Sequence, residues 1–165
     1  MHERFPFLRT AISATTRPMR PTEQNGREYH FLSEDEFLTH VAGDEFLEHV
    51  TYAGNRYGTL RSEVDRHLHN GDSVVLEIEL RGARALRDAL PDAVTIFIEP
   101  PSRDELVRRL RARDTEAEVD IQARLAESLV ELEASQEFNY RVRNDDLDAA
   151  TAEMARIVDA VTRSL

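Results

Sequence analysis

Two short apolar runs constrain the fold of this chain more than any other part of its sequence. Residues 73–78 (SVVLEI) and 93–98 (AVTIFI) are rich in β-branched side chains and hardly alternate with polar ones, which is typical of strands covered on both faces of a parallel sheet. Between the two runs, Ala83, Leu86 and Leu90 repeat at helical spacing. This alternation of strand and helix predicts an α/β fold.

Helical spacing of apolar residues also predicts helices in the second half of the chain. One amphipathic helix is expected over 121–132 and another over 147–165, with a short strand between them over 140–143. Ser102 and Glu105 form a capping-box pattern, which predicts that a helix starts soon after the second apolar run.

Residues 27–59 have a different pattern. Strand-like pieces lie at 29–32 and 46–52, and a capped helix is expected from Ser33. Together with several glycines, these pieces predict a small β-rich flap inserted into the α/β core. The length of 165 residues predicts a single domain over 1–165.

The charge balance limits the partners that this chain can bind. Its formal net charge is −11, so an anion site has to concentrate positive charge locally, and no nucleic-acid surface is expected. The chain has no cysteine, no apolar run long enough to span a bilayer and no secretory signal, which favours a cytoplasmic protein with no membrane partner. The six histidines are interpreted as surface or packing residues, and no metal site is expected.

A phosphate clamp is predicted within residues 13–31 (SATTRPMRPTEQNGREYHF). Arg17 and Arg20 are each followed by a proline that restricts the backbone, and two guanidinium forks can grip phosphate oxygens in a way that lysine cannot. Nearby hydroxyl donors are Ser13, Thr15 and Thr16. Taken alone, the two arginines fit a solvated surface loop equally well. All 21 basic residues are arginines, so no lysine is present to complete a GxxxxGK[ST] phosphate loop.

A second group of residues has the chemistry to select a purine. The carboxylate of Glu48 can accept two parallel hydrogen bonds from guanine, whereas adenine would present an acceptor to it. Tyr29 and Tyr57 can donate phenolic hydroxyls to a phosphate, and Thr59 can reach the edge of a base.

As a set, these residues resemble guanylate kinase, the nucleoside monophosphate kinase family that transfers a phosphoryl group from ATP to GMP. The matching segments follow the order of the family through nearly the whole chain: 13–31, 45–59 (EFLEHVTYAGNRYGT), 76–83 (LEIELRGA), 97–113 (FIEPPSRDELVRRLRAR) and 144–148 (NDDLD). The resemblance implies a parallel sheet like that of P-loop kinases, flanked by helices, with a GMP-binding flap over 27–59 and a helical lid over 111–124.

The resemblance also implies a role for each matching residue. Those expected to hold the GMP phosphate are Ser13, Arg17, Arg20, Tyr29 and Tyr57. Those expected to select guanine are Glu48, Thr59 and Glu79. The lid arginines Arg113 and Arg124 would be catalytic, Asn144 would lie beside the adenine of ATP, and Glu23 would support the clamp from behind. ATP and Mg²⁺ are the cofactors that the family implies, and the expected partners are the small molecules GMP and ATP.

The resemblance breaks at the start of the chain. Family members begin with a strand and a glycine-rich loop that cradles the ATP phosphates, whereas 2–8 resembles only the tail of the first helix. From this we expect a chain that lacks the first strand and the phosphate loop, binds GMP, is weak or inactive in catalysis alone, and exposes apolar strand edges.

Two alternatives remain open from the sequence. The chain could be a non-catalytic module that uses the same clamp to hold GMP or phosphorylated protein segments, although Glu48 would then have no purpose. A related sugar-phosphate kinase on the same fold would have equally little use for that carboxylate.

Overall fold

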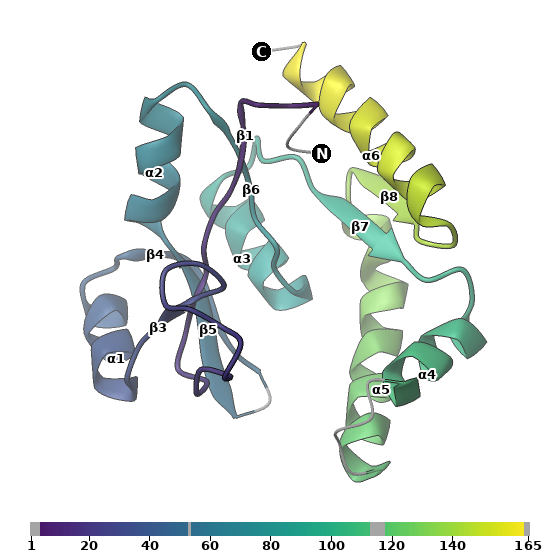
Figure 1. Ribbon diagram of the computed structural model, residues 1–165, viewed down its shortest axis with the longest axis horizontal. Helices are drawn as coiled ribbons and strands as arrows, with labels where there is room; N and C mark the ends of the chain where they lie inside the picture. The colour runs from purple at the N-terminus through teal and green to yellow at the C-terminus, as the bar shows by residue number, and fades with distance from the viewer. Residues whose placement is uncertain (1–3, 53, 113–117, 164–165) are drawn as a thin grey trace. The chain divides into compact units, whose positions relative to one another are not determined.

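The computed structural model describes residues 4–52, 54–112 and 118–163, and the chain divides into two compact units (Figure 1). The first unit is Met1–Ala93 and the second is Val94–Leu165. Each unit has a parallel strand pair whose strands are separated in sequence by helices, which confirms the α/β prediction. That the whole of 1–165 acts as one domain stays a prediction. No helix in the ranges described is both long enough and apolar enough to cross a membrane.

The parallel pair of the first unit joins β1 (Leu8–Thr10) to β6 (Ser73–Val75), with Leu8 opposite Ser73. β6 is shorter than the predicted strand because the chain leaves the ladder after Val75. β1 was not predicted, since its segment was expected to end a helix. Residues 4–7 instead form a turn, in which the Leu8 N–H donates to the Phe5 carbonyl at 3.0 Å. Phe5 and Leu8 are both buried, so the turn and the strand that follows it each bury an apolar side chain.

A four-stranded sheet forms the predicted flap. Its strand order is β3 (His30–Phe31), β2 (Ala14–Thr15), β5 (Asn55–Leu60) and β4 (Phe46–Tyr52). β4 and β5 are an antiparallel hairpin, and Gly54 in its turn has a φ of 76°, a left-handed conformation that favours glycine. β2 pairs with β3 in parallel and with β5 in antiparallel fashion. The sheet therefore reaches beyond the predicted flap, because β2 comes from residues that precede it.

The helix α1 (Glu34–Ala42) covers the flap sheet and starts at the predicted cap. The Ser33 hydroxyl accepts a hydrogen bond from the Glu36 N–H at 3.2 Å, while the Glu36 carboxylate accepts from the Ser33 N–H at 2.7 Å. This reciprocal pair satisfies two backbone donors that a helix start leaves open. Phe37 of α1 is fully buried and stacks on Phe46 with 4.4 Å between ring centroids. The small core of the flap is thus built around two stacked rings, with Ala14 buried beside them.

Two more helices complete the first unit. α2 (Arg61–His69) follows β5, and α3 (Leu80–Ala89) follows β6. α3 buries Ala83 and Leu86 of the predicted apolar face, whereas Leu90 is its C-cap and is exposed. The helix packs against β4 of the flap. Glu79 precedes α3 as its N-cap, and its Oε1 accepts from the Gly82 N–H at 2.9 Å. The start of α3 is therefore held beside the flap sheet.

The second unit is built around the parallel pair of β7 (Ile96–Glu99) and β8 (Tyr140–Arg143). Its other elements are α4 (Arg103–Ala112), α5 (Glu118–Glu133), the 3₁₀ helix η1 (Ala134–Glu137) and α6 (Leu147–Thr162). The predicted strand over 140–143 and the Ser102 cap are confirmed, since the Ser102 hydroxyl accepts from the Glu105 N–H at 3.1 Å. β7 starts later than predicted because Thr95 is bonded through its N–H and its hydroxyl to the Asn139 side chain.

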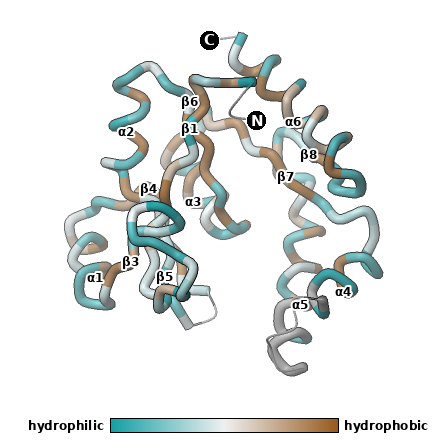
Figure 2. The backbone as a smooth tube through the Cα atoms, in the orientation of Figure 1, coloured by the Kyte–Doolittle hydropathy of each residue, from teal (hydrophilic) through white to brown (hydrophobic). Residues whose placement is uncertain are grey.

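The strand pairs and the loop that carries the predicted clamp differ in hydropathy. Figure 2 shows β6 and β7 as apolar stretches in brown, whereas the loop between β2 and β3 is mainly teal. A polar loop of this length is held in place mainly by its own hydrogen bonds and ion pairs.

Candidate functional site

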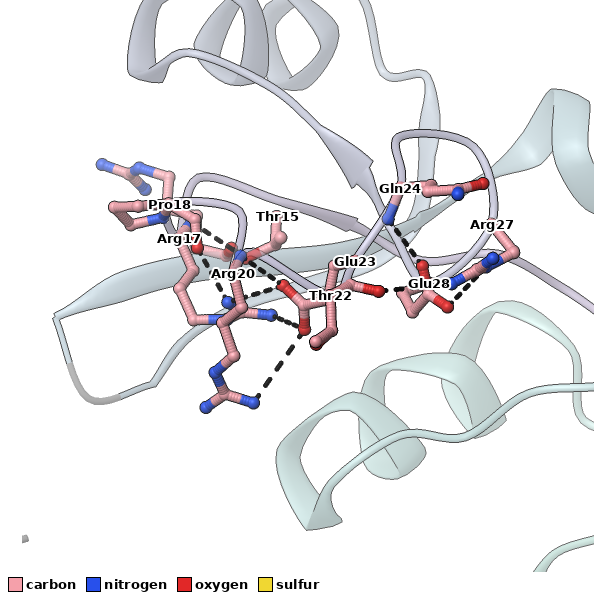
Figure 3. A network of polar contacts seen from close by, with 10 residues as sticks. Thr15, Arg17, Pro18, Arg20, Thr22, Glu23, Gln24, Arg27 and Glu28 are labelled. Carbon is pink, nitrogen blue, oxygen red and sulfur yellow. Dashed lines mark hydrogen bonds and ion pairs between the residues drawn. The ribbon is translucent and has the colours of Figure 1, made fainter. Parts of the chain in front are cut away.

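The loop between β2 and β3 is organised around the carboxylate of Glu23 (Figure 3). Arg17 donates to it with both terminal nitrogens, Nη2 to Oε1 at 2.8 Å and Nη1 to Oε2 at 3.1 Å. The Arg17 side chain is only 16% exposed, and its guanidinium lies over the rings of Tyr29 at 5.4 Å and Phe31 at 5.6 Å. These cation–π contacts and the bidentate pair fix its position. The prediction that Glu23 supports the clamp is confirmed.

Arg20 is held much more loosely than Arg17. Its backbone N–H donates to Glu23 Oε2 at 2.8 Å, but its side chain is 71% exposed and its Nη1 lies 3.9 Å from Glu23 Oε1. The two arginines that look equivalent in sequence therefore differ in the structure. Arg17 is part of the frame of the loop, and Arg20 presents a largely open guanidinium.

The ion pair also fixes the charge state of both partners. Hydrogen bonding to Arg17, with a further bond from the Arg20 N–H, holds the pKa of the Glu23 carboxyl below its usual range. Hydrogen bonding to Glu23 raises the pKa of Arg17, and Tyr57 adds to this effect. Around Glu23, one carboxylate therefore faces two guanidinium groups, which leaves a net positive charge for an anion.

The hydroxyls of Thr15 and Thr16 both bond within the protein, Thr15 as donor and acceptor and Thr16 as acceptor. Thr15 is fully buried, and its Oγ1 donates to the Arg56 carbonyl at 3.0 Å and accepts from the Arg17 N–H at 3.1 Å. Thr16 Oγ1 accepts from the Arg56 N–H at 2.9 Å. Both hydroxyls join the loop to β5. The prediction that Thr15 offers its hydroxyl to a ligand is wrong, because its donor is used within the protein.

The structure brings Tyr29 and Tyr57 next to the clamp. Their ring centroids are 6.1 Å apart in an edge-to-face arrangement. The Arg17 guanidinium lies over the ring of Tyr29, and Tyr57 interacts with Arg17 electrostatically. Ser13 lies directly before β2, and its carbonyl accepts from the His30 N–H at 2.9 Å. The structure thus brings Arg17, Tyr29 and Tyr57 together, and their binding of a phosphate stays a prediction.

Glu48 lies on β4 and is only 5% exposed. It is opposite Thr59 in the β4–β5 register, and the Thr59 hydroxyl donates to Glu48 Oε1 at 2.7 Å. Burial raises the pKa of the Glu48 carboxyl, the bond from Thr59 opposes this, and repulsion from Glu79 adds to it. The structure therefore places the three predicted guanine-selecting residues close together.

Glu79 contributes to this group mainly through its position at the start of α3. One of its oxygens is used as the helix cap to Gly82. Glu48 Oε2 lies on the same glycine, only 2.8 Å from the point that a Cβ there would occupy. Two carboxylates thus converge on the N-terminal end of a helix, which favours negative charge. Gly82 was not predicted to matter, because its only signal in the sequence is a glycine in the first turn of a helix.

The sites predicted in the second unit are described only in part. Arg113 lies outside the described residues, and Arg124 lies in α5 with its side chain outside them. The proposed lid over 111–124 is thus described only at its ends. Asn144 follows β8, and its N–H donates to the Glu99 carbonyl at 2.8 Å. It lies at the carboxyl ends of the parallel strands β7 and β8, where α/β sheets commonly bind ligands.

The histidine and carboxylate side chains that the structure describes do not form a metal cluster. No group of three or more of them is arranged to hold a metal ion. His40 is an example of the packing role predicted for the histidines, since its Nδ1 lies 2.7 Å from Glu45 Oε2 and its ring contacts Phe46.

Comparison with known proteins identifies the group to which the chain belongs. The family model described as "Guanylate kinase" matches residues 2–161. A guanylate kinase of Synechococcus sp. (strain JA-3-3Ab) is 46% identical over 158 residues, which cover 96% of this chain and 73% of the relative. One from Rubrobacter xylanophilus is 48% identical over 153 residues, covering 93% of this chain and 80% of the relative.

The solved structures agree with these relatives. The crystal structure of guanylate kinase from Anaplasma phagocytophilum is similar with a TM-score of 0.80 and 30% sequence identity. The match covers 93% of this chain and 76% of that one, which confirms the predicted kinase-like α/β architecture. The chain is a member of the guanylate kinase family.

Proposed function

We propose that this chain binds GMP in its first unit and belongs to an ATP:GMP phosphotransferase that forms GDP and ADP in cytoplasmic purine nucleotide metabolism. One observation supports this most directly: Glu48, a buried carboxylate bonded to Thr59, lies on the same sheet as an arginine clamp. Thr59 and Tyr57 are two residues apart on β5, so their side chains emerge on one face of the sheet. A purine at Glu48 and a phosphate near Tyr57 fit that face.

At the base end, selection is a matter of hydrogen-bond polarity. An ionised Glu48 accepts from the N1–H and N2–H donors of guanine, while adenine offers an acceptor at N1 and would be repelled. The Thr59 hydroxyl holds Glu48 Oε1 at 2.7 Å, which orients the carboxylate before the nucleotide arrives. Glu79 adds negative charge next to it.

At the phosphate end, we assign direct binding to the exposed fork of Arg20 and to the hydroxyls of Tyr29 and Tyr57. Arg17 is already bonded to Glu23, so it contributes mainly its charge and the shape of the loop. Ser13 completes the group from the start of β2. An anion bound there would meet two guanidinium charges with only one carboxylate behind them.

The second nucleotide is assigned to the second unit. The family uses ATP and Mg²⁺ in general, and the metal supplies charge neutralisation at the phosphates during transfer. In this chain we propose that Asn144 lies beside the adenine. We assign Arg113 and Arg124 to the stabilisation of negative charge on the transferring phosphoryl group.

Titration calorimetry with three ligands tests the GMP assignment. GMP is expected to bind at least about tenfold more tightly than AMP. AMP cannot form the two hydrogen bonds between the base and the Glu48 carboxylate, and their loss costs at least about 1.4 kcal/mol. A phosphoserine peptide serves as the third ligand. Binding of the peptide together with equal affinities for GMP and AMP would contradict the proposal and support a phosphopeptide module. Turnover with ATP is measured separately, so that binding and catalysis are judged independently.

Acidification is expected to reduce the preference for guanine, and the loss should begin at a higher pH than that at which an ordinary glutamate is protonated. Burial raises the pKa of the Glu48 carboxyl, and a protonated carboxyl presents a donor where guanine also has donors. The measurement is the dissociation constant of IMP, which lacks the N2 amino group, divided by that of GMP, from about pH 8 down to about pH 5. Both ligands carry the same phosphate, so its own titration cancels in the ratio.

The ratio should fall towards one on acidification in the unmodified chain and stay flat in Glu48→Gln. A ratio that is constant with pH in the unmodified chain would show that Glu48 does not contact the base.

A further inference from the structure

Gly82 lies where the side chain of Glu48 needs space. It is buried in the first turn of α3, and a Cβ added to it would meet Glu48 Oε2 at 2.8 Å and Glu48 Cδ at 3.4 Å. Real Cβ atoms essentially never approach another heavy atom closely enough to match the first of these distances. The carboxylate end of Glu48 therefore occupies the volume that a side chain at position 82 would fill.

An added methyl group at this position would also be close to a second side chain. The Cβ of Ile78 would be 3.3 Å from it. The backbone is held as well, because the Gly82 N–H donates to Glu79 Oε1 at 2.9 Å within the cap of α3. The group that can yield is the Glu48 carboxylate, whose other oxygen is bonded to Thr59.

Backbone conformation does not explain the glycine. Gly82 does not have a positive φ. Among the described residues, the glycines that do are Gly26, Gly54 and Gly71. Alanine is also the better helix former, so a glycine in this turn works against the stability of α3. The close approach of Glu48 is the feature of the structure that accounts for it.

We propose that Gly82 is a positioning residue for guanine selection: the absence of a side chain there sets where the Glu48 carboxylate lies. This inference rests on the proposed binding of GMP. Gly82 itself makes no hydrogen bond to the base in this proposal. It acts through Glu48, which must lie against the start of α3 to keep both its bond to Thr59 and its orientation towards the purine.

The test is Gly82→Ala in the full chain, with GMP and AMP titrated by calorimetry. GMP affinity is expected to fall about fivefold to tenfold, because displacement weakens hydrogen bonds to a charged acceptor. AMP affinity should stay within about twofold, since AMP makes no such bonds. The melting temperature is expected to change little, because the better helix propensity of alanine offsets the strain of the contact with Glu48. A purely structural glycine would instead give a lower melting temperature and an unchanged ratio of GMP to AMP affinity.

Gly43→Ala is the matched control. A Cβ at Gly43 would meet the carboxylate of Glu45 at a similar distance, 2.9 Å to Oε1, but this glutamate is 57% exposed and lies outside the proposed site. The same substitution and the same type of contact are therefore made without moving Glu48. The ratio of GMP to AMP affinity should not change.

A double variant keeps the inference testable if Gly82→Ala folds poorly. Glu48→Asp withdraws the carboxylate by one methylene, so adding Gly82→Ala to it should cost little further GMP affinity. The double variant is therefore compared with Glu48→Asp alone, and its GMP affinity is expected to lie within about twofold of that single variant.

The results separate this inference from the proposed function. An unmodified chain without a preference for GMP would remove the proposed function. The role of Gly82 alone would be overturned if the unmodified chain prefers GMP and a folded Gly82→Ala variant shows the same ratio of GMP to AMP affinity. A double variant that binds GMP much more weakly than Glu48→Asp alone would overturn it as well.

Discussion

Replacing Glu48 with glutamine is expected to weaken GMP binding by about 1 to 3 kcal/mol, or roughly 5- to 150-fold. The side chain is buried and opposite Thr59, whose hydroxyl donates to it at 2.7 Å. A glutamine of the same length keeps an acceptor for Thr59 but places an amide donor near a base that also offers donors. Calorimetry with GMP, guanosine and AMP checks this. Guanosine should lose as much affinity as GMP, while AMP should be little affected.

The same substitution is expected to stabilise the free protein near neutral pH. Burial raises the pKa of Glu48 in the folded chain, so between its unfolded pKa and this higher value the folded state binds more protons than the unfolded state. Stability therefore falls as the pH rises through that window, and the full cost is present above it. Glu48→Gln removes that cost. Thermal unfolding without ligand should show a melting temperature that is unchanged or higher.

Glu45→Gln provides the control for both effects, since Glu45 is exposed on the same flap. It should change neither GMP affinity nor, to any large extent, the pH dependence of unfolding. If Glu48→Gln leaves GMP affinity unchanged, the assignment of guanine to this carboxylate is wrong.

Replacing Arg20 with alanine is expected to weaken GMP binding by about 10- to 100-fold, while guanosine binding stays within about twofold. The side chain is 71% exposed and lies 3.9 Å from Glu23, so its guanidinium is available for a phosphate. Because its surroundings in the folded protein are mostly solvent, the melting temperature should change little. Comparison of GMP with guanosine isolates the phosphate end of the site from the base end.

Two further variants sharpen this result. Arg27→Ala removes another exposed arginine of the same loop, one that pairs with Glu28 at 2.6 Å, and should leave GMP affinity nearly unchanged. Arg20→Lys keeps the charge but loses the planar fork, so its GMP affinity should be intermediate. An equal loss of GMP and guanosine affinity in Arg20→Ala would show that the loop shapes the whole pocket and does not bind the phosphate through Arg20.

Local sequence patterns predicted those parts of the fold that local forces decide. The cap at Ser33 and the helical spacing of α3 are written within a few neighbouring residues, and both are confirmed. The strands β1 and β2 span only three and two residues, too few for a periodic pattern. They are strands because β6, β3 and β5 pair with them, and pairing across so many residues leaves no local signature.

The site shows the same division. The types of residue that bind an anion or a purine edge were visible in the sequence, and so was the support of the clamp by Glu23. What could not be predicted is how differently Arg17 and Arg20 are held, because that depends on the rings of Tyr29 and Phe31. The internal use of Thr15 likewise depends on a contact 41 positions away.

The attachment of the clamp loop to Glu23 has a thermodynamic consequence for ligand capture. The Arg17 side chain and the backbone at Arg20 are already fixed before any anion arrives. The conformational entropy lost on binding is therefore confined largely to the long side chain of Arg20, a cost of about 0.5 to 1.5 kcal/mol. Most of the attraction between the two guanidinium charges and a phosphate therefore contributes to the binding free energy. The loop has no regular secondary structure, so it is the bonds to Glu23 that order it in advance.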